Sequence, residues 1–477
     1  METKKETNVE ESNMSNLPQK SNNKLFRDKK TTFIAISLAL IFFCSSCALG
    51  MISPFFPRKA SEKGCSKTTI GLIFSVHPLV IFLFSPIVGK MIPYIGPKFC
   101  LIGGCTVEGA SLILFGFAIH LPNGIPFILF CFCIRIITAL GSACTLTASL
   151  TFTATLFKDN LNTVNGIVES SFGAGFMAGP AIGGILYKVG GFTLPFLVLG
   201  LCVICLIFSL IFILPSSKEL QDDCSHHHDV TESSLIKVLL VPGVLIMTSV
   251  NIMIGIANTF FDTTLANHIN SITNNTLSVM QIGFFFLIPS GFYTFSAPIV
   301  GVVADKLNAG RSFMVIGSFL CFAGYMFIGP SPLVRYVVPA HLWVVCISLA
   351  VIGITVSLCF VPVISHMQES AIDAGFEDNL VTASLVSGIW NGSLSIGNTV
   401  GPTFAGIFTD HFGFPWASTV IAFLFLAEGT GLVIYTAWNR RKRLNIDNSG
   451  YKPLKETHKE LEEEIEDYND LHNKTES

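Results

Sequence analysis

Among the ionisable side chains inside long apolar runs of this sequence, four could bind a cation or a proton. They are Asp262, Glu169, Arg135 and His77. An ionisable group inside a bilayer is costly, so each of them is a functional candidate. Arg135, one apolar run before Glu169, would keep that carboxylate ionised until a substrate or a proton competed for it. His77 could titrate between neutral and acidic pH.

Structural alternatives remain open for these candidates. Arg135 and Glu169 could form a buried ion pair that only joins two helices. His77 precedes Pro78, so it could be a packed histidine at a break in a helix. For Asp262 we favour a functional role, because it is the single charge of a polar stripe.

Polar stripes run along three of the apolar segments. On one face of the segment at 240–268 lie Asn251, Gly255, Asn258 and Asp262. Similar stripes include Arg135 in the fourth segment and Asn391 in the eleventh. Three such stripes favour a central cavity that water can reach, whereas hydrogen bonding between helices is the alternative for single Ser or Thr residues.

The composition indicates that these side chains belong to a membrane protein. Of 477 residues 51% are hydrophobic and 13% charged, and the mean hydropathy is +0.62. A soluble protein has about 25% charged residues. Helices of about 20 apolar residues cross a bilayer, and twelve runs qualify: 33–53, 70–92, 98–119, 126–155, 164–187, 193–214, 240–268, 279–304, 311–330, 341–366, 380–408 and 414–438. The sequence predicts an all-α membrane protein with 12 transmembrane helices.

Other chemistries find little support in the sequence. The net charge is −3 and most charges lie in the tails and middle loop, so we expect no nucleic-acid partner. The 14 cysteines lie mostly in apolar runs without zinc or disulfide spacing. Cys224 and the histidines at 226–228 lie in a polar loop that we interpret as a linker. We therefore expect no metal, no cofactor and no enzyme activity, since no nucleophile–base arrangement occurs either.

The polar stretch at 216–238 divides the apolar runs six and six. It predicts two six-helix bundles, at 31–215 and 239–439, between an N-terminal tail at 1–30 and an acidic tail at 440–477. Basic clusters flank the first and last runs, and an even number of spans places both clusters on one side, the cytosol. The loop at 57–67 is also basic and conflicts with this orientation, but we give the two flanking clusters more weight.

Both halves contain a glycine–proline motif inside a helix-length run. The first copy contains Gly175, Gly179, Pro180 and Gly183, and the second contains Gly401 and Pro402. Glycines four residues apart share one face and let a neighbouring helix approach closely, while a proline permits a bend. The matching places indicate an internal repeat, as in secondary transporters. We expect these motifs to form a pivot between the halves, with simple helix packing as the alternative.

A loop motif also occurs twice. Its later copy contains Gly301, Asp305, Lys306, Gly310 and Arg311, and its earlier copy keeps Gly89, Gly96 and Lys98 but has Pro93 in place of the aspartate. We expect Asp305 to accept charge-assisted bonds from Lys306, Arg311 or a helix N-terminus. Such bonds would latch the cytosolic side in one state, and a solvated positive-inside loop is the alternative.

These motifs resemble known signatures of the major facilitator superfamily. The later loop resembles its G-x-x-x-D-R-x-G-R-R motif, and the first glycine–proline copy resembles its antiporter signature. More closely, residues 31–443 resemble the vesicular amine transporters through PFFP at 54–57, RIITALGSAC at 135–144 and FFDTTL at 260–265. The resemblance implies the major facilitator fold, with two six-helix bundles around a central site.

The chain departs from that family at acidic positions. Anchored on the shared motifs, the acids of the monoamine and acetylcholine members fall on Ser45, Asn391 and close to Ser357, and their second-span lysine falls on His77. Only the seventh-span acid remains, as Asp262, while Glu169 is an acid in the first half. This pattern is similar to the vesicular polyamine transporter branch.

The superfamily's arrangement also places the third and twelfth helices outside the cavity. We therefore expect Glu108 and Glu428, which fall in those two helices, to be structural or to reach toward the membrane surface.

The resemblance implies a proton-coupled antiporter that moves polyamines (spermine, spermidine) or related amines from the cytosol into acidic vesicles. Asp262 and Glu169 would hold ammonium groups, with aromatic faces from Phe260, Phe261, Tyr293 or Trp390. A vesicular monoamine or organic-cation antiporter is one alternative, and a non-transporting membrane receptor on a transporter fold is another.

Two short sequence motifs bear on the cellular location of the protein and on its orientation in the membrane. Tyr451–Leu454 fits a sorting motif read by adaptors, and Asn274-Asn275-Thr276 is a glycosylation sequon in a loop that we assign to the lumen. We expect a multi-pass protein of secretory-vesicle or lysosome-like membranes, with both termini in the cytosol.

Overall fold

The computed structural model describes residues 29–52, 56–215, 235–274, 276–277, 279–334 and 341–448. In this part of the chain every regular element is a helix. The expected N-terminal tail lies almost wholly outside the described residues. So do most of the loop predicted at 216–238, the sequon's Asn275, and the tail with Tyr451–Leu454.

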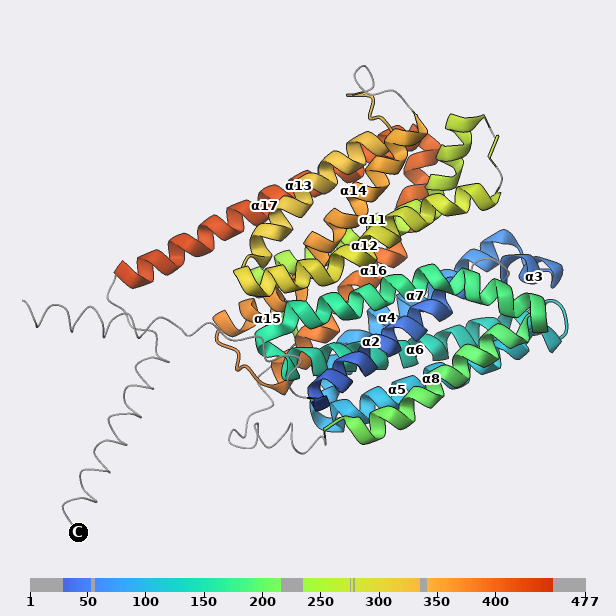
Figure 1. Ribbon diagram of the computed structural model, residues 1–477, viewed down its shortest axis with the longest axis horizontal. Helices are drawn as coiled ribbons and strands as arrows, with labels where there is room; N and C mark the ends of the chain where they lie inside the picture. Colours follow the sequence, from blue (N-terminus) through green and yellow to red (C-terminus); the bar gives the residue numbers. More distant parts are fainter. Residues whose placement is uncertain are drawn as a thin grey trace, which may run out of the picture.

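The first half forms one bundle, shown in blue to green in Figure 1. Its α-helices are α2 (Lys29–Ile52), α3 (Phe56–Glu62), α4 (Lys67–Ile95), α5 (Pro97–Gly116), α6 (Ile125–Leu156), α7 (Leu161–Gly190) and α8 (Thr193–Ile213). Two short 3-10 helices, η1 (Phe117–His120) and η2 (Lys158–Asn160), lie in its connections.

The second half forms the other bundle, shown in yellow-green to red. Its helices are α10 (Leu235–Leu239), α11 (Pro242–Thr273), α12 (Val279–Leu307), α13 (Gly310–Ile328), α14 (Leu342–Phe360), α15 (Val363–Asp373), α16 (Leu380–Phe412) and α17 (Phe414–Asn448).

Helices pair in the same way within the two bundles. In the first, α2 packs on α7, and α5 packs on α6 and α8. In the second, α11 packs on α16, and α13 packs on α14 and α17. This match of partners agrees with the internal repeat that the glycine–proline motifs indicate.

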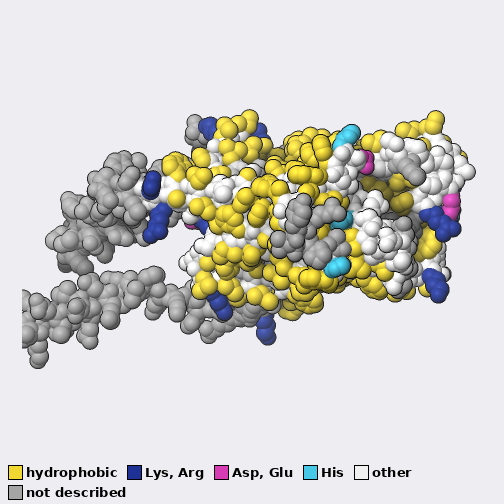
Figure 2. All heavy atoms as spheres, turned by 90° about the horizontal axis from the view of Figure 1, so that it is seen from above, with side chains coloured by type: hydrophobic (Ala, Val, Ile, Leu, Met, Phe, Trp, Pro, Cys, Tyr) yellow, Lys and Arg dark blue, Asp and Glu magenta, His cyan; other side chains and the backbone are white. Residues whose placement is uncertain are grey.

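Ten helical stretches of the described chain are long and apolar enough to cross a membrane. Helices α7 and α16, with 30 and 33 residues, do not reach that hydropathy although both are long enough. They are the two glycine–proline helices, and their Gly, Ser and Asn content lowers their hydropathy. Figure 2 shows hydrophobic side chains over most of the described part of one face, with Lys and Arg gathered toward its two ends. This distribution suits a bilayer around the middle of the bundles.

The glycine stripes pack helices within each bundle. A Cβ at Gly179 would lie 2.5 Å from the carbonyl oxygen of Cys47, and Gly175 faces the carbonyl of Phe43, both on α2. In the second bundle Gly397 and Gly401 face the backbone of α11 in the same way. These glycines therefore serve close packing of α7 on α2 and of α16 on α11, each within one bundle, and their expected role as a pivot between the halves stays a prediction. Gly183 is buried on the same helix as Gly179, and Pro180 and Pro402 lie inside helices that continue past them.

We predict that Gly179→Ala destabilises the protein while Gly184→Ala does not. The added methyl group at 179 would meet the α2 backbone, and such overpacking costs about 1–3 kcal/mol. A methyl group at Gly184, on the same helix, would have no neighbour within 4 Å among the described residues, and alanine improves helix propensity by about 1 kcal/mol. Thermal unfolding of the two purified variants in detergent measures the difference. Equal melting temperatures would contradict the packing described for Gly179.

Candidate functional site

Two helix pairs form most of the contact between the bundles. Helix α7 of the first bundle packs on α12, and α4 packs on α16. Both α7 and α16 begin at the same end of the bundles, which we call the latch end. Among the described residues, the hydrogen bonds and ion pairs between bundles lie before α7 and α16 or in their first halves. These contacts close the latch end.

Asp305, at the end of α12, caps the start of α7 from the other bundle. One carboxylate oxygen accepts bonds from the backbone and side-chain nitrogens of Asn162 (3.3 and 2.8 Å), and the other from the backbone nitrogen and hydroxyl of Thr163 (2.6 and 2.5 Å). The N-cap residue of α7, Asn160, makes no side-chain cap bond among the described residues. An anionic group at a helix N-terminus is favourable because the first amides lack partners there and carry a partial positive charge.

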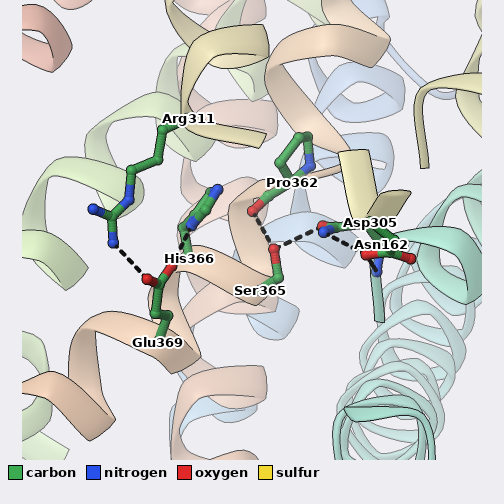
Figure 3. A network of polar contacts seen from close by, with 7 residues as sticks. All are labelled: Asn162, Asp305, Arg311, Pro362, Ser365, His366 and Glu369. Atoms are coloured by element: carbon green, nitrogen blue, oxygen red, sulfur yellow. Dashed lines mark hydrogen bonds and ion pairs between the residues drawn. The ribbon is translucent and has the colours of Figure 1, made fainter. Parts of the chain in front are cut away.

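The basic residues of the loop motif do not bind Asp305 among the described contacts. Arg311 pairs instead with Glu369 of α15 at 3.0 Å, and Glu369 also contacts His366 at 2.8 Å. Figure 3 shows this second group beside the Asp305 contacts. Lys306 forms no bond with Asp305 in the described chain, so of the three expected partners only the helix N-terminus is used.

Two further contacts hold the α7 start in place. Ser365 of α15 donates a hydrogen bond to the Asn162 side-chain oxygen at 2.7 Å, as Figure 3 shows. Gly301 lies so close to the Asn162 carbonyl that a side chain there would clash. The motif glycine is therefore required by the approach of α12 to α7.

The earlier copy of the loop motif, in the first bundle, does not cap the equivalent helix α16. Pro93 stands where an aspartate could reach α16, and α16 caps itself, since Asn379 accepts a bond from the Thr382 nitrogen at 3.0 Å. Lys98 binds the last carbonyls of α8 at 2.8 Å. An exposed ion pair of 2.9 Å between Lys158 and Asp378 crosses the interface there. Only one of the two repeated loops therefore supplies a cap across the interface.

Glu169 lies six residues, or about 9 Å, beyond Thr163 on α7. Its side chain is 4% exposed, and the Tyr293 hydroxyl of α12 donates a hydrogen bond to its carboxylate at 3.1 Å. The neighbouring Ser170 binds the Thr294 carbonyl at 2.6 Å. A buried carboxyl group thus lies on the contact between the bundles.

Arg135 is not the partner of Glu169. Its Nε donates to the Ile73 carbonyl of α4 at 3.4 Å, and no ion pair joins it to Glu169 among the described residues. The reason is the packing: α7 lies mainly on α2 and α12, whereas α6 lies on α5 and α4. Both side chains are buried, Arg135 at 5% exposure, but on different helix contacts.

Tyr293 belongs to a row of aromatic rings within the second bundle. Its ring centre lies 6.5 Å from that of Phe360, which lies 5.0 Å from that of Trp390. The Trp390 indole nitrogen is buried without a described hydrogen-bond partner. Phe260 and Phe261 instead pack on Tyr325 within the second bundle. Of the four expected aromatic faces, only Tyr293 and Trp390 belong to this row.

The remaining polar candidates lie on other helices and form no described hydrogen bond with Glu169. Asn391 of α16 is buried and reaches the first bundle, where it donates to Ser85 at 2.9 Å and to Thr147 at 3.4 Å. His77 is buried on α4, with no described partner for Nε2. Asn258 is exposed on α11.

Asp262 lies eleven residues before the end of α11, and its side chain is outside the described part of the structure. Its proposed role remains a prediction. The residues that sequence reasoning missed are Asn162 and Thr163. Both lie in the first turn of a long helix, directly after Asn160, and this position is the signal for a helix start that needs a cap.

Similarity to known proteins agrees with this geometry. The family model described as Major Facilitator Superfamily matches residues 38–376. The MFS-type transporter SLC18B1 of Rattus norvegicus is 33% identical over 424 residues, which cover 88% of this chain and 90% of that protein. The synaptic vesicular amine transporter of Homo sapiens is 24% identical over 371 residues, or 74% of this chain and 64% of that protein.

A solved structure shows the same fold. The human organic anion transporter MFSD10 (TETRAN) superposes with a TM-score of 0.64 at 14% identity, covering 85% of this chain and 100% of that one. At this identity the similarity supports the arrangement of helices alone.

We predict that Asp305→Asn loosens the start of α7. An amide keeps the shape but loses the charge, and charge-assisted bonds are worth about 1–2 kcal/mol more than neutral ones. Backbone amides at 162 and 163 should therefore exchange hydrogen about 5- to 30-fold faster, as measured by mass spectrometry. Asp410→Asn is the control, because Asp410 is exposed near the opposite end of α16. Unchanged exchange in Asp305→Asn would show that the cap does not hold α7.

Proposed function

Because the chain belongs to the major facilitator superfamily, we propose that it is a proton-coupled antiporter of polyamines or related organic amines. It would move spermine, spermidine or similar cations from the cytosol into acidic vesicles. The observation that carries this proposal is Glu169, a carboxyl group buried on the contact between the two bundles.

The surroundings of Glu169 suit an ammonium group. No basic side chain pairs with it among the described residues, so no internal cation competes with a cationic substrate for this carboxyl group. The rings of Tyr293, Phe360 and Trp390 follow on the side of the second bundle. Aromatic faces attract cations, and more strongly where water is excluded.

A polyamine carries several positive charges and therefore needs more than one carboxylate. Asp262 on α11 is the second carboxylate that we assign to the substrate, from the opposite bundle. Two carboxylates in different bundles could each hold one ammonium group of the same extended cation. A substrate with several charges would then contact both moving parts.

Proton coupling follows from competition for the same carboxylates. A proton from an acidic lumen neutralises the carboxylate, which weakens its hold on the amine and releases it. The neutral site then reorients as one bundle rocks against the other, and the proton leaves to the cytosol. With the latch end toward the cytosol, as the basic flanks predict, the conformation described here is closed on the side of amine entry.

A monoamine or organic-cation antiporter is the second candidate. It is favoured by the 24% identity to a synaptic vesicular amine transporter. Against it, Ser45, Ser357 and Asn391 stand where the resemblance places acids in monoamine carriers. Ser357 bonds to Ser296 at 2.7 Å and is fully buried, so that position offers no charge. A non-transporting receptor would instead bind an amine without moving it across the membrane.

Location remains part of the proposal. We place the protein in the membrane of secretory vesicles or lysosome-like organelles, with both termini in the cytosol and Tyr451–Leu454 available to a sorting adaptor. Immunostaining of cells expressing the full chain, with and without Tyr451→Ala, tests this placement.

The test of the proposed function is uptake by purified protein in liposomes under an imposed pH gradient, with spermine, spermidine, serotonin and acetylcholine as separate substrates. We expect accumulation of the polyamines. Glu169→Gln should bind them about 10- to 150-fold more weakly, since a hydrogen bond to a charged group contributes about 1.5–3 kcal/mol. Asp262→Asn should also lose uptake.

The matched control is Glu428→Gln on α17, whose carboxylate bonds to Ser249 away from the bundle contact. Wild-type uptake by both Glu169→Gln and Asp262→Asn would exclude the proposed mechanism. Accumulation of serotonin alone would favour the monoamine alternative, and binding without accumulation would favour a receptor.

A further inference from the structure

The first bundle contains a second buried carboxyl group that the proposed substrate site does not use. Glu108 lies midway along α5, and its side chain is 3% exposed. From the sequence we expect a structural residue or one that reaches toward the membrane surface. In the structure its carboxyl group points inward and not toward the membrane surface, and Ser45 of α2 and Ser142 and Thr145 of α6 lie around it.

Glycines bring α5 and α6 close enough for this arrangement. A Cβ at Gly141 of α6 would lie 2.8 Å from the backbone nitrogen of Glu108, and one at Gly104 of α5 would lie 2.7 Å from that of Thr145. The two backbones therefore nearly touch beside the carboxyl group. Hydroxyl groups continue toward the end opposite the latch, where Thr138 donates to Ser111 at 2.8 Å.

No positive charge balances Glu108 among the described residues, since none of the ion pairs includes it. The titratable groups that face it are the thiols of Cys44 on α2 and Cys105 on α5, and Cys202 of α8 faces Cys44. Arg135 of α6 lies ten residues from Thr145, or about 15 Å along the helix.

One oxygen of this carboxyl group also lacks a partner. Oε2 of Glu108 is buried and has no hydrogen bond to any described atom. A carboxylate left in this state at membrane depth is costly, because neither a counter-charge nor enough donors replace its water. A protonated carboxyl group carries no charge, so it suits the same place far better.

We propose that Glu108 is a proton-binding residue of the transport cycle, which holds a proton in the conformation described here and releases it when the latch end opens. The proton forms an O–H bond with the carboxylate on arrival from the lumen, and that bond breaks on release to the cytosol. This inference rests on the proposed function and adds a proton site that no substrate ammonium has to reach.

The test compares two modes of spermidine transport by full-length protein in liposomes. Exchange of labelled for unlabelled spermidine needs no net proton movement, whereas accumulation under a pH gradient does. Glu108→Gln should keep exchange and lower pH-gradient-driven accumulation, because glutamine has the shape of the protonated acid but cannot take up or release the additional proton. Glu428→Gln should keep both.

A second variant separates the proton role from a packing role. Ser45→Asp combined with Glu108→Gln moves the carboxyl group to the facing helix and should restore accumulation. Wild-type accumulation by Glu108→Gln, or equal loss of exchange and accumulation, would overturn the proton role. If the wild-type protein exchanged no spermidine, the proposed function itself would fail, and this inference with it.

Discussion

The start of α7 depends on a carboxylate that belongs to the other bundle. A helix that begins inside a protein contact must find partners for its first amides, and Asp305 supplies them to Asn162 and Thr163. Glu169 lies on the same helix pair, about 9 Å further along. The cap therefore belongs to the same helix contact that holds Glu169 against Tyr293. The closed end and the buried acid are therefore parts of one helix contact.

Much of this fold follows from the sequence because a bilayer permits few solutions. Apolar runs, the polar divide at 216–238 and the repeated motifs lead to twelve helices in two bundles, and the structure shows the same helix pairing in both halves. The polarity of α7 and α16 has a reason visible in the structure. They form the contact between bundles, so their less apolar faces meet protein instead of lipid.

Side-chain partners could not be predicted in the same way. A helical run fixes the angle of Glu169 on its own helix, but not which helix lies opposite, and the expected partner Arg135 faces α4 instead. The surroundings of Glu108 also could not be predicted from its own helix. Its helix lies on the outside in the expected arrangement, yet the residue faces inward because Gly104 and Gly141 bring α5 against α6. The glycine stripes of α7 and α16 likewise serve packing within a bundle, since spacing alone does not distinguish one neighbour from another.

The difference between the two helix starts also matters while the chain is being made. Asn379 lies next to the helix that it caps, so α16 is complete at its start as soon as it is synthesised. The cap of α7 is encoded 143 residues later. At 5–20 residues per second, the ribosome needs roughly 7–30 s to reach it. For that time the start of α7 lacks the carboxylate that caps it in the folded protein.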